Sequence, residues 1–479
     1  CLPPPQKTPN KHSSAMLCAG FPSCVGVVIV LWLLLALVVS GASYLEEEVA
    51  TDPQTVLSPR ERCQLHKKGA FLFPGSCQEP SDSAGRAFAA ANVITARTPV
   101  VLIPGLGGSA LEAKLKKHKG PHWYCTSNAD WFRLWFSSKE LFVQDCWVSN
   151  MDMRFDEGSG TFQDAQGTTV RVMDFGGVKG IDYLDYIFGV PDTFSAYFAS
   201  VIKSLEQVGY KVGQDLAGAP YDWRRPIDDK GNYDDHLRSL VEALYARNGQ
   251  RPVALVAHSM GGPTALHFLG QQTQEWKEQY IEQLITLGSP WLGAFKSLRA
   301  ILIGDEFGIS LVREAKLKEA ARHMGGLVWL LPQPVKDTAE VLVTTKSREY
   351  RIGDLEQLFR DAGTPVTSAI YRKHGRKLSS LDAPGVPFHC MYALGLDTET
   401  SARFANGLTG SPRLETASGD GTVPASSLQH CRNWDGKNGQ TVTTEEFSKI
   451  SHTEMLSDET VIRSLLARLV KTETRSATE

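Results

Sequence analysis

A serine enclosed by small residues stands in the segment AHSMG, residues 257–261. The apolar residues 252–257 before it are typical of a buried strand, and the apolar residues after it are typical of a helix. This order is that of a nucleophile elbow, G-x-S-x-G, with Ala257 in the place of the first glycine. The sharp turn would expose the Ser259 hydroxyl at a helix N-terminus, where the helix dipole favours a developing anion. The segment therefore predicts a nucleophilic serine; the alternative interpretation is a serine that only caps the helix.

A nucleophilic serine needs a general base and an acid, which in this architecture follow it in the order Ser, Asp, His. Asp420 lies between two glycines that let the backbone turn sharply, and we expect it directly after the strand that contains Met391 and Tyr392. His452 lies in a polar turn before the last predicted helix, a better position for a base than those of the five other histidines after Ser259. We expect His452 to take the serine proton and Asp420 to hold the imidazole. The alternatives are a simple Asp-Gly turn and a surface or capping histidine.

A second glycine-rich turn lies in PVVLIPGLGGSA, residues 99–110. Its glycines fit the dinucleotide fingerprint G-x-G-x-x-[G/A], but a Rossmann helix should follow them. Gly120 and Pro121 would interrupt such a helix after about ten residues, so we exclude a nucleotide. In a hydrolase elbow the backbone amides of Leu106 and Met260 would instead be the oxyanion donors, each worth roughly 3 kcal/mol in the transition state.

The composition excludes several other classes of protein. The chain has 479 residues and 42% apolar residues, enough for a single elaborated α/β domain with a sizeable core. The formal net charge of −3 gives no reason to expect a nucleic-acid partner. No C-x-x-C pair indicates a structural zinc site, and we expect neither a metal nor a cofactor.

The N-terminal region has the features of a targeting segment. An unbroken apolar run over residues 25–39 follows two lysines and precedes small residues. Residues 1–42 are therefore a signal peptide or a signal anchor, and a start at Met16 would leave residues 1–15 untranslated. We expect the protein in the secretory pathway, either secreted or in the lumen of a lysosome or vacuole, with an N-terminal membrane anchor as the alternative.

Export changes how the cysteines are interpreted. An even number beyond the targeting segment suggests three disulfides, although six cysteines allow about 15 connectivities. Pairing of near neighbours would join Cys63 to Cys77, Cys125 to Cys146 and Cys390 to Cys431.

Aromatic residues crowd the segment of about 121–147, with Arg133 and Lys139 among them. Tryptophans beside basic residues suit a bilayer interface, which predicts a lid that binds membranes. The alternative is a short helix that buries its aromatic side chains against the core. The apolar residues concerned are Trp123, Trp131, Phe132, Trp135, Phe136, Leu141 and Phe142.

Two further segments have a predicted structural role. In PYDWRR, residues 220–225, Asp222 and Arg224 could form a buried ion pair that fixes a loop near the site; direct contact with a lipid headgroup is the alternative. Residues 295–376 or thereabouts carry helical patches without recognisable chemistry, and we expect them to form a cap that shapes an acyl groove.

Together these segments resemble the lecithin:cholesterol acyltransferase family, within it the lysosomal phospholipase A branch. The matching pieces appear in the family's order over about residues 99–470 and are PVVLIPG, LEAKL, DCW, GAPYDWRR, AHSMG, LGSPWLG, GDGTV and SHTEML. The resemblance implies an α/β-hydrolase core with a cap domain and a disulfide-closed, membrane-binding lid, and no metal requirement. It also implies the disulfides Cys125–Cys146 and Cys390–Cys431.

The expected layout is an N-terminal extension over residues 43–97, a hydrolase domain over residues 98–470 and a tail over residues 471–479. We expect a calcium-independent serine enzyme that cleaves a fatty acyl chain from membrane phospholipids and passes it to water or an alcohol. An O-acyltransferase specific for sterol, ceramide or diacylglycerol is the first alternative, since the chemistry up to the acyl-enzyme is the same. A lipid-binding protein without catalysis is the remote alternative.

Overall fold

The computed structural model describes residues 83–116, 120–137, 143–187, 190–191, 195–305, 314–334 and 340–474. Several predictions lie outside these residues: the targeting segment, most of the N-terminal extension, Cys63, Cys77, Leu141 and Phe142. Within the described ranges, no helix is long and apolar enough to cross a bilayer.

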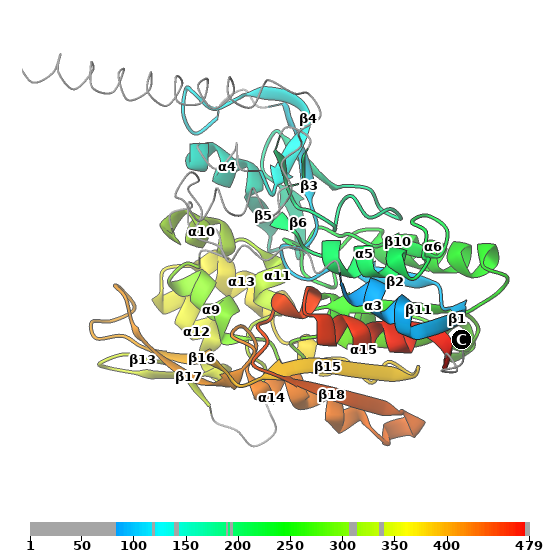
Figure 1. The fold of residues 1–479 in the computed structure, drawn as a ribbon. Helices are drawn as coiled ribbons and strands as arrows, with labels where there is room; N and C mark the ends of the chain where they lie inside the picture. Colours follow the sequence, from blue (N-terminus) through cyan, green and yellow to red (C-terminus); the bar gives the residue numbers. More distant parts are fainter. Residues whose placement is uncertain are drawn as a thin grey trace, which may run out of the picture. The chain divides into compact units, whose positions relative to one another are not determined.

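A parallel sheet of six strands forms the centre of the fold (Figure 1). The inner strand β2 is apolar throughout because both faces of the sheet are covered. Val101 and Ile103 pack into one hydrophobic cluster, and Val100 and Leu102 pack into the other. In spatial order the strands are β10 (Leu216–Gly218), β2 (Val100–Ile103), β11 (Val253–His258), β12 (Ile281–Leu287), β15 (Phe388–Leu394) and β18 (Val442–Ser448).

Helices cover both faces of this sheet, as expected for an α/β-hydrolase core. The last helix, α15 (Glu459–Leu469), begins at Asp458, whose side chain accepts hydrogen bonds from two backbone amides. In Figure 1 it lies against α3 (Ala84–Ala91), and it also contacts α5 (Ala199–Gln207). The other face packs against α6 (Tyr233–Arg247), α7 (Gly261–Gly270) and α8 (Gln274–Tyr280). After α15 the chain forms β19 (Val470–Thr474), which pairs antiparallel with β1 (Asn92–Arg97).

The chain leaves the core after β2 and forms a small antiparallel sheet. Its strand order is β4 (Asn128–Trp135), β3 (Leu111–Lys116) and β7 (Thr168–Val172). Helix α4 (Gln144–Met151) and the hairpin of β5 (Met153–Asp156) and β6 (Thr161–Asp164) complete this part, and the short pair β8 (Tyr186–Ile187) and β9 (Val190–Pro191) follows. The aromatic residues 131–135 therefore lie on a strand, and the alternative of a short helix there is wrong.

A second excursion lies between β12 and β15. It contains α9 (Phe295–Leu302), α10 (Glu314–Ala321), α11 (Gly325–Trp329), α12 (Leu355–Asp361) and α13 (Pro365–His374). Figure 1 shows these helices grouped beside a four-stranded sheet of order β14-β13-β16-β17. The strands are β13 (Val341–Thr344), β14 (Glu349–Arg351), β16 (Leu396–Arg403) and β17 (Arg413–Gly419).

The four-stranded sheet corrects one prediction. Met391 and Tyr392 lie on β15, but Asp420 does not follow that strand directly, because β16 and β17 intervene. These two strands pair antiparallel, so the chain returns to the point where it left, and Asp420 forms a bridge with Leu396. A hairpin can thus be inserted while the position of Asp420 at the end of the central sheet is kept.

Candidate active site

Ser259 stands at the sharp turn between β11 and α7. Its φ of +55° lies in the left-handed region, which is uncommon for a residue other than glycine and typical of a strained functional turn. A side chain at the next positions would collide with the core. A Cβ at Gly261 would lie 2.4 Å from the carbonyl oxygen of Ile103, and one at Gly262 would lie 2.1 Å from Ser289 Oγ. The small residues of the motif are therefore a steric requirement of the turn.

Asp420 is buried at the turn that follows β17. The backbone amides of Thr422 and Val423 donate to Asp420 Oδ1 over 3.0 and 2.7 Å, so this oxygen is held in place. The other oxygen, Oδ2, lies 2.7 Å from His452 Nδ1. Both neighbouring glycines are required by the turn, because a Cβ at Gly419 would lie 2.3 Å from the carbonyl oxygen of Val423 and Gly421 has a φ of +85°.

His452 links this carboxylate to the serine. Its Nε2 lies 2.8 Å from Ser259 Oγ, and its backbone amide donates to the carbonyl oxygen of Asp420 over 2.9 Å. Because a carboxylate accepts, Nδ1 carries the hydrogen, and Nε2 of the neutral ring can accept from the serine hydroxyl. The structure therefore brings together the three predicted residues Ser259, His452 and Asp420 in the geometry required for proton removal from a serine.

The loop with the predicted donor Leu106 adjoins the serine. A Cβ at Gly105 would lie 2.6 Å from Ser259 Cβ, so only a glycine allows this approach. The amide of Gly108 donates to the carbonyl oxygen of Gly105 over 3.1 Å, which closes a tight turn around Leu106. The other predicted donor, Met260, is buried directly before the first residue of α7. After the glycine turn the chain enters β3 and not a helix, so the structure has no Rossmann helix at this loop.

The predicted lid residues divide into two groups. Trp123 is 95% exposed, whereas Trp135 is only 7% exposed and packs on the rings of Trp147 and Trp223. Between these extremes, Trp131 lies under the Arg171 guanidinium, with 3.9 Å from its carbon to the ring centre. Phe132 and Phe136 are partly buried against the core. The segment is thus neither wholly packed nor wholly presented to solvent.

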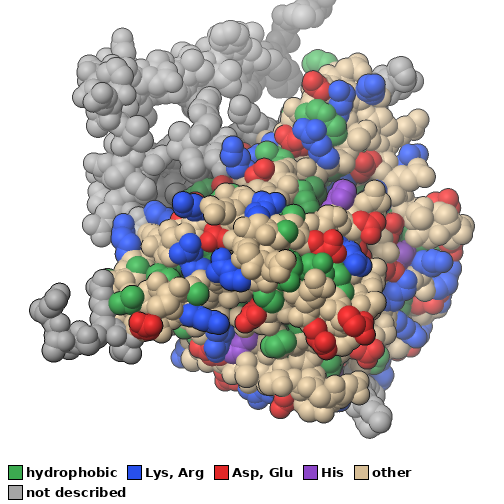
Figure 2. All heavy atoms as spheres, turned by 90° about the vertical axis from the view of Figure 1, so that its right-hand side faces the viewer, with side chains coloured by type: hydrophobic (Ala, Val, Ile, Leu, Met, Phe, Trp, Pro, Cys, Tyr) green, Lys and Arg blue, Asp and Glu red, His purple; other side chains and the backbone are tan. Residues whose placement is uncertain are grey.

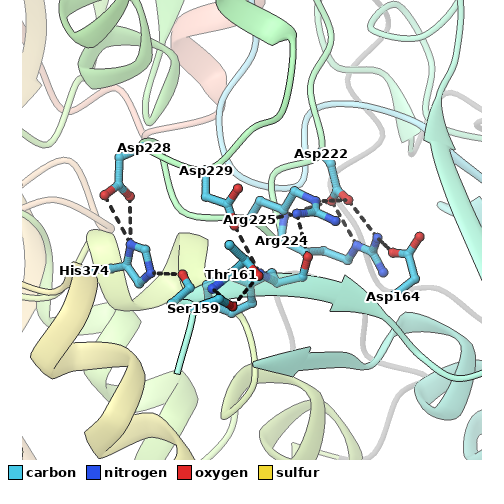
Figure 3. Close-up of polar contacts among 11 residues, drawn as sticks. Ser159, Thr161, Asp164, Asp222, Arg224, Arg225, Asp228, Asp229 and His374 are labelled. Carbon is cyan, nitrogen blue, oxygen red and sulfur yellow. Dashed lines mark hydrogen bonds and ion pairs between the residues drawn. The ribbon is translucent and has the colours of Figure 1, made fainter. Parts of the chain in front are cut away.

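The predicted ion pair between Asp222 and Arg224 is confirmed (Figure 3). Arg224 is fully buried, and its Nε and Nη2 donate to the two Asp222 oxygens over 2.9 and 2.7 Å. Burial raises the pKa of Asp222, but the charges of Arg224 and Arg225 and the hydrogen bonds from Arg224 together lower it by more, so the carboxylate stays ionised. A guanidinium with no exposed surface cannot reach a lipid headgroup, which favours the structural role.

The cluster contains a second carboxylate that was not predicted from the sequence. Asp164 at the end of β6 accepts from Arg224 Nη2 over 2.8 Å, and the carbonyl oxygen of Met151 accepts from Nη1 over 3.1 Å. Asp164 lies 60 residues before Arg224, so no local spacing could indicate it. Arg224 thereby joins the loop after β10 to the hairpin of β5 and β6.

Two of the expected disulfides are present. Cys125 pairs with Cys146, with 5.4 Å between the Cα atoms, and Cys390 pairs with Cys431 over 6.6 Å. Both pairings are those implied by the family resemblance.

The electrostatic character of the molecule is ordinary on the face drawn in Figure 2. Basic and acidic side chains are interspersed there, in keeping with the formal net charge of −3. Among the described residues, no group of three or more His, Cys, Asp or Glu side chains is placed to hold a metal ion.

Comparison with known proteins places these features in a family context. The family model described as lecithin:cholesterol acyltransferase matches residues 131–374 and 371–459. The lysosomal phospholipase A and acyltransferase of Canis lupus familiaris is 34% identical over 401 residues, which cover 83% of this chain and 95% of that protein. The Homo sapiens protein of the same name is 34% identical over 371 residues, 77% of this chain and 89% of that one. The phosphatidylcholine-sterol acyltransferase of Mus musculus is 31% identical over 379 residues, 78% of this chain and 85% of that one.

Proposed function

The chain belongs to the lecithin:cholesterol acyltransferase family, and from this we propose that it is a serine phospholipase A and O-acyltransferase. It would cleave a fatty acyl chain from a membrane phospholipid and pass it to water or to an alcohol. The hydrogen-bonded row of Ser259, His452 and Asp420 is the observation that carries this proposal. The printed names of the relatives, which combine phospholipase and acyltransferase activities, support it.

The reaction begins with attack of Ser259 Oγ on the acyl carbonyl carbon while His452 Nε2 takes the hydroxyl proton. The amides of Leu106 and Met260 would donate to the oxygen that gains negative charge, and Asp420 would stabilise the imidazolium. The ester bond then breaks, and His452 returns the proton to the departing lysophospholipid alcohol. An acyl group remains on Ser259.

The second half of the reaction regenerates the serine. Water or an alcohol loses its proton to His452 and attacks the acyl-enzyme, and Ser259 recovers its hydrogen from the imidazolium. Acyl transfer to a sterol, ceramide or diacylglycerol is the second candidate, favoured by the relatives named acyltransferases. Every proton in both halves is moved by a side chain of this chain, so we expect chelation of calcium with EGTA to leave activity unchanged.

We assign the segment 121–147 to membrane binding and the segment 295–376 to a cap that shapes the acyl groove. The strongly exposed Trp123 supports the first assignment. The lysosomal relatives support a lysosomal or secreted location. Mass spectrometry of the mature N-terminus from expressing cells would distinguish a cleaved signal peptide from a retained anchor in residues 1–42.

The decisive experiment labels the protein with a fluorophosphonate and compares two serine variants. Ser289 is the matched control because it is also buried beside the elbow and lies against Gly262. Ser259→Ala should abolish labelling and acyl release from phosphatidylcholine vesicles, whereas Ser289→Ala should keep both. Persistence of acyl release in Ser259→Ala would overturn the proposal. Mass spectrometry of products with each alcohol offered in turn would identify the acceptor, and free fatty acid alone would exclude transfer.

A further inference from the structure

A row of hydrogen bonds outside the triad joins the oxyanion loop to the loop of the base. The amide of Gly105 donates to the hydroxyl oxygen of Tyr197 over 2.8 Å, and this hydroxyl lies 2.6 Å from His258 Nδ1. On the other side of the ring, His258 Nε2 lies 3.0 Å from the backbone carbonyl oxygen of His452. Four residues from distant parts of the chain are connected in this way.

The direction of each hydrogen bond in the row is fixed. The His452 carbonyl can only accept, so His258 Nε2 must donate. Burial lowers the pKa of His258 well below its usual range, and the nearby His452 ring lowers it further, so the ring is neutral and Nδ1 accepts. Tyr197 therefore donates to Nδ1, and burial raises the pKa of its phenol, which keeps the hydrogen in place. The phenol oxygen is then free to accept the Gly105 amide.

These hydrogen bonds involve residues next to the predicted oxyanion donor and next to the nucleophile. Gly105 directly precedes the predicted donor Leu106, and His258 directly precedes Ser259. The rings of His258 and His452 lie with their centres 4.8 Å apart. A positive charge on His258 would oppose the imidazolium that His452 must become, whereas a neutral ring permits it.

We propose that Tyr197 and His258 are positioning residues for acyl transfer, which set the oxyanion loop and the base loop at the distance that the reaction requires. This inference rests on the proposed function of Ser259, His452 and Asp420. Neither residue exchanges a proton with substrate; both act through the backbone groups that they hold. Because a misplacement of about 1 Å can cost a hundredfold in rate, loosening this row should slow the chemical step and leave substrate binding unchanged.

Tyr197→Phe tests the proposal because it removes one hydroxyl and keeps the ring. Tyr210→Phe is the matched control, since the Tyr210 hydroxyl is also held by the protein, facing the carbonyl oxygens of Thr98 and Leu469 at 2.8 and 3.0 Å. On a soluble short-chain ester, we expect Tyr197→Phe to lower kcat about tenfold to a hundredfold with KM within about twofold. We expect Tyr210→Phe to keep kcat while its melting temperature falls. Equal kcat in both variants, at similar loss of melting temperature, would overturn the proposal.

A pair of variants at His258 tests the other half of the row. A glutamine amide can donate to the His452 carbonyl and accept from Tyr197, whereas leucine can do neither. His258→Leu should lower kcat at least tenfold, and His258→Gln should recover most of that loss. Rates for the two variants that fall together would contradict the proposal.

The pH dependence of kcat/KM and the labelling of Ser259 separate this inference from the proposed function. The acid limb reports the base, so it should remain in Tyr197→Phe while the plateau falls. If wild-type protein neither reacts with fluorophosphonate nor hydrolyses the ester, the proposed function itself has failed. If wild-type protein does both and His258→Leu and Tyr197→Phe match it, only the positioning role has failed. Should Tyr197→Phe not fold, the two His258 variants decide: loss of kcat in His258→Leu with near wild-type kcat in His258→Gln supports the role, and equal kcat in the two variants refutes it.

Discussion

The indole nitrogen of Trp135 donates a hydrogen bond to the backbone carbonyl oxygen of Gly107, and the two atoms lie 2.7 Å apart. Trp135 ends β4 inside the segment closed by the Cys125–Cys146 disulfide. Gly107 has a φ of +73° and lies in the loop of the predicted donor Leu106; a Cβ at Gly107 would be 3.3 Å from the Trp135 ring. The segment proposed to bind membranes is thus in direct contact with the loop proposed to stabilise the transition state.

Trp135→Phe should weaken catalysis without weakening membrane binding. The phenyl ring keeps the packing on Trp147 and Trp223 but leaves the Gly107 carbonyl without its donor, a loss of about 1 kcal/mol that is felt in the transition state. We expect kcat on a soluble ester to fall roughly fivefold to tenfold, with vesicle sedimentation unchanged. Trp276→Phe is the control, because the Trp276 indole also donates a hydrogen bond, over 2.7 Å to Glu242, away from the site. An equal fall of kcat in the two variants would show that the hydrogen bond to Gly107 makes no specific contribution to catalysis.

Trp123→Ala should have the opposite profile. Trp123 is 95% exposed and its ring has an edge contact with Tyr124, so removing it costs little packing in solution, but an indole at the headgroup level contributes to binding. We expect the partition constant on phosphatidylcholine vesicles to fall about tenfold while kcat on a soluble ester stays unchanged. Val212→Ala, at another exposed apolar position, should bind vesicles as wild type does. Unchanged partition of Trp123→Ala would remove the main support for a membrane-binding segment.

The sequence predicts the elbow and the buried strands, but it does not predict which of these two tryptophans is buried. The elbow could be predicted because its requirement for small residues is local, and β2 and β11 could be predicted because strands covered on both faces are apolar throughout. Trp123 and Trp135 both stand next to an aromatic residue, so their sequence neighbours do not show which one is buried. Trp135 is buried at the end of β4, where it pairs with Leu111 of β3, and Trp123 lies outside that strand. That pairing depends on contacts distant in sequence.

For Asp420, the residue itself could be predicted from the sequence, but the strand before it could not. Asp420 could be predicted as a partner of His452 because its Gly-Asp-Gly turn is a local signal, and the structure places its Oδ2 2.7 Å from His452 Nδ1. The prediction that Asp420 directly follows the strand with Met391 and Tyr392 was wrong, because β16 and β17 leave the central sheet and return to it. Such a hairpin changes the connection without changing the position of the carboxylate, so no residue near Asp420 reveals it.

Arg224→Lys should destabilise the fold strongly although the charge is kept. A lysine cannot reproduce the fork that contacts Asp222, Asp164 and the Met151 carbonyl, so two partly buried carboxylates and a buried carbonyl would lose hydrogen bonds. We expect the free energy of unfolding in urea to fall by about 3 kcal/mol. Arg463→Lys, in an exposed pair with Glu459, should change it by less than about 0.5 kcal/mol. A similar small loss in both variants would show that the cluster does not fix the loop.

The last prediction concerns Asp228, which ties the core to the cap region (Figure 3). Its carboxylate accepts from His374 Nδ1 over 3.0 Å, from Trp329 Nε1 over 2.9 Å and from Lys377. Burial alone raises the pKa of Asp228, but the hydrogen bonds from His374 and Lys377 and the charges of these two residues together lower it by more, so the net pKa lies well below the ordinary 3.8. A carboxylate with a lowered folded-state pKa stabilises the fold fully above its unfolded pKa, and this contribution disappears as the pH falls through the folded value.

Asp228→Asn should therefore unfold more easily at pH 7, by about 2 kcal/mol, and the difference from wild type should shrink steadily below about pH 4. Urea unfolding of both proteins between pH 7 and pH 2.5 measures this difference directly, because titrations of other groups cancel between them. Asp130→Asn is the control, since the Asp130 carboxylate is exposed beside Lys114, where solvent screens the pair, and the substitution should change stability far less than Asp228→Asn does. A difference between Asp228→Asn and wild type that stayed constant down to pH 2.5 would show that the lost contacts are packing and hydrogen bonds of the side chain, and not its charge.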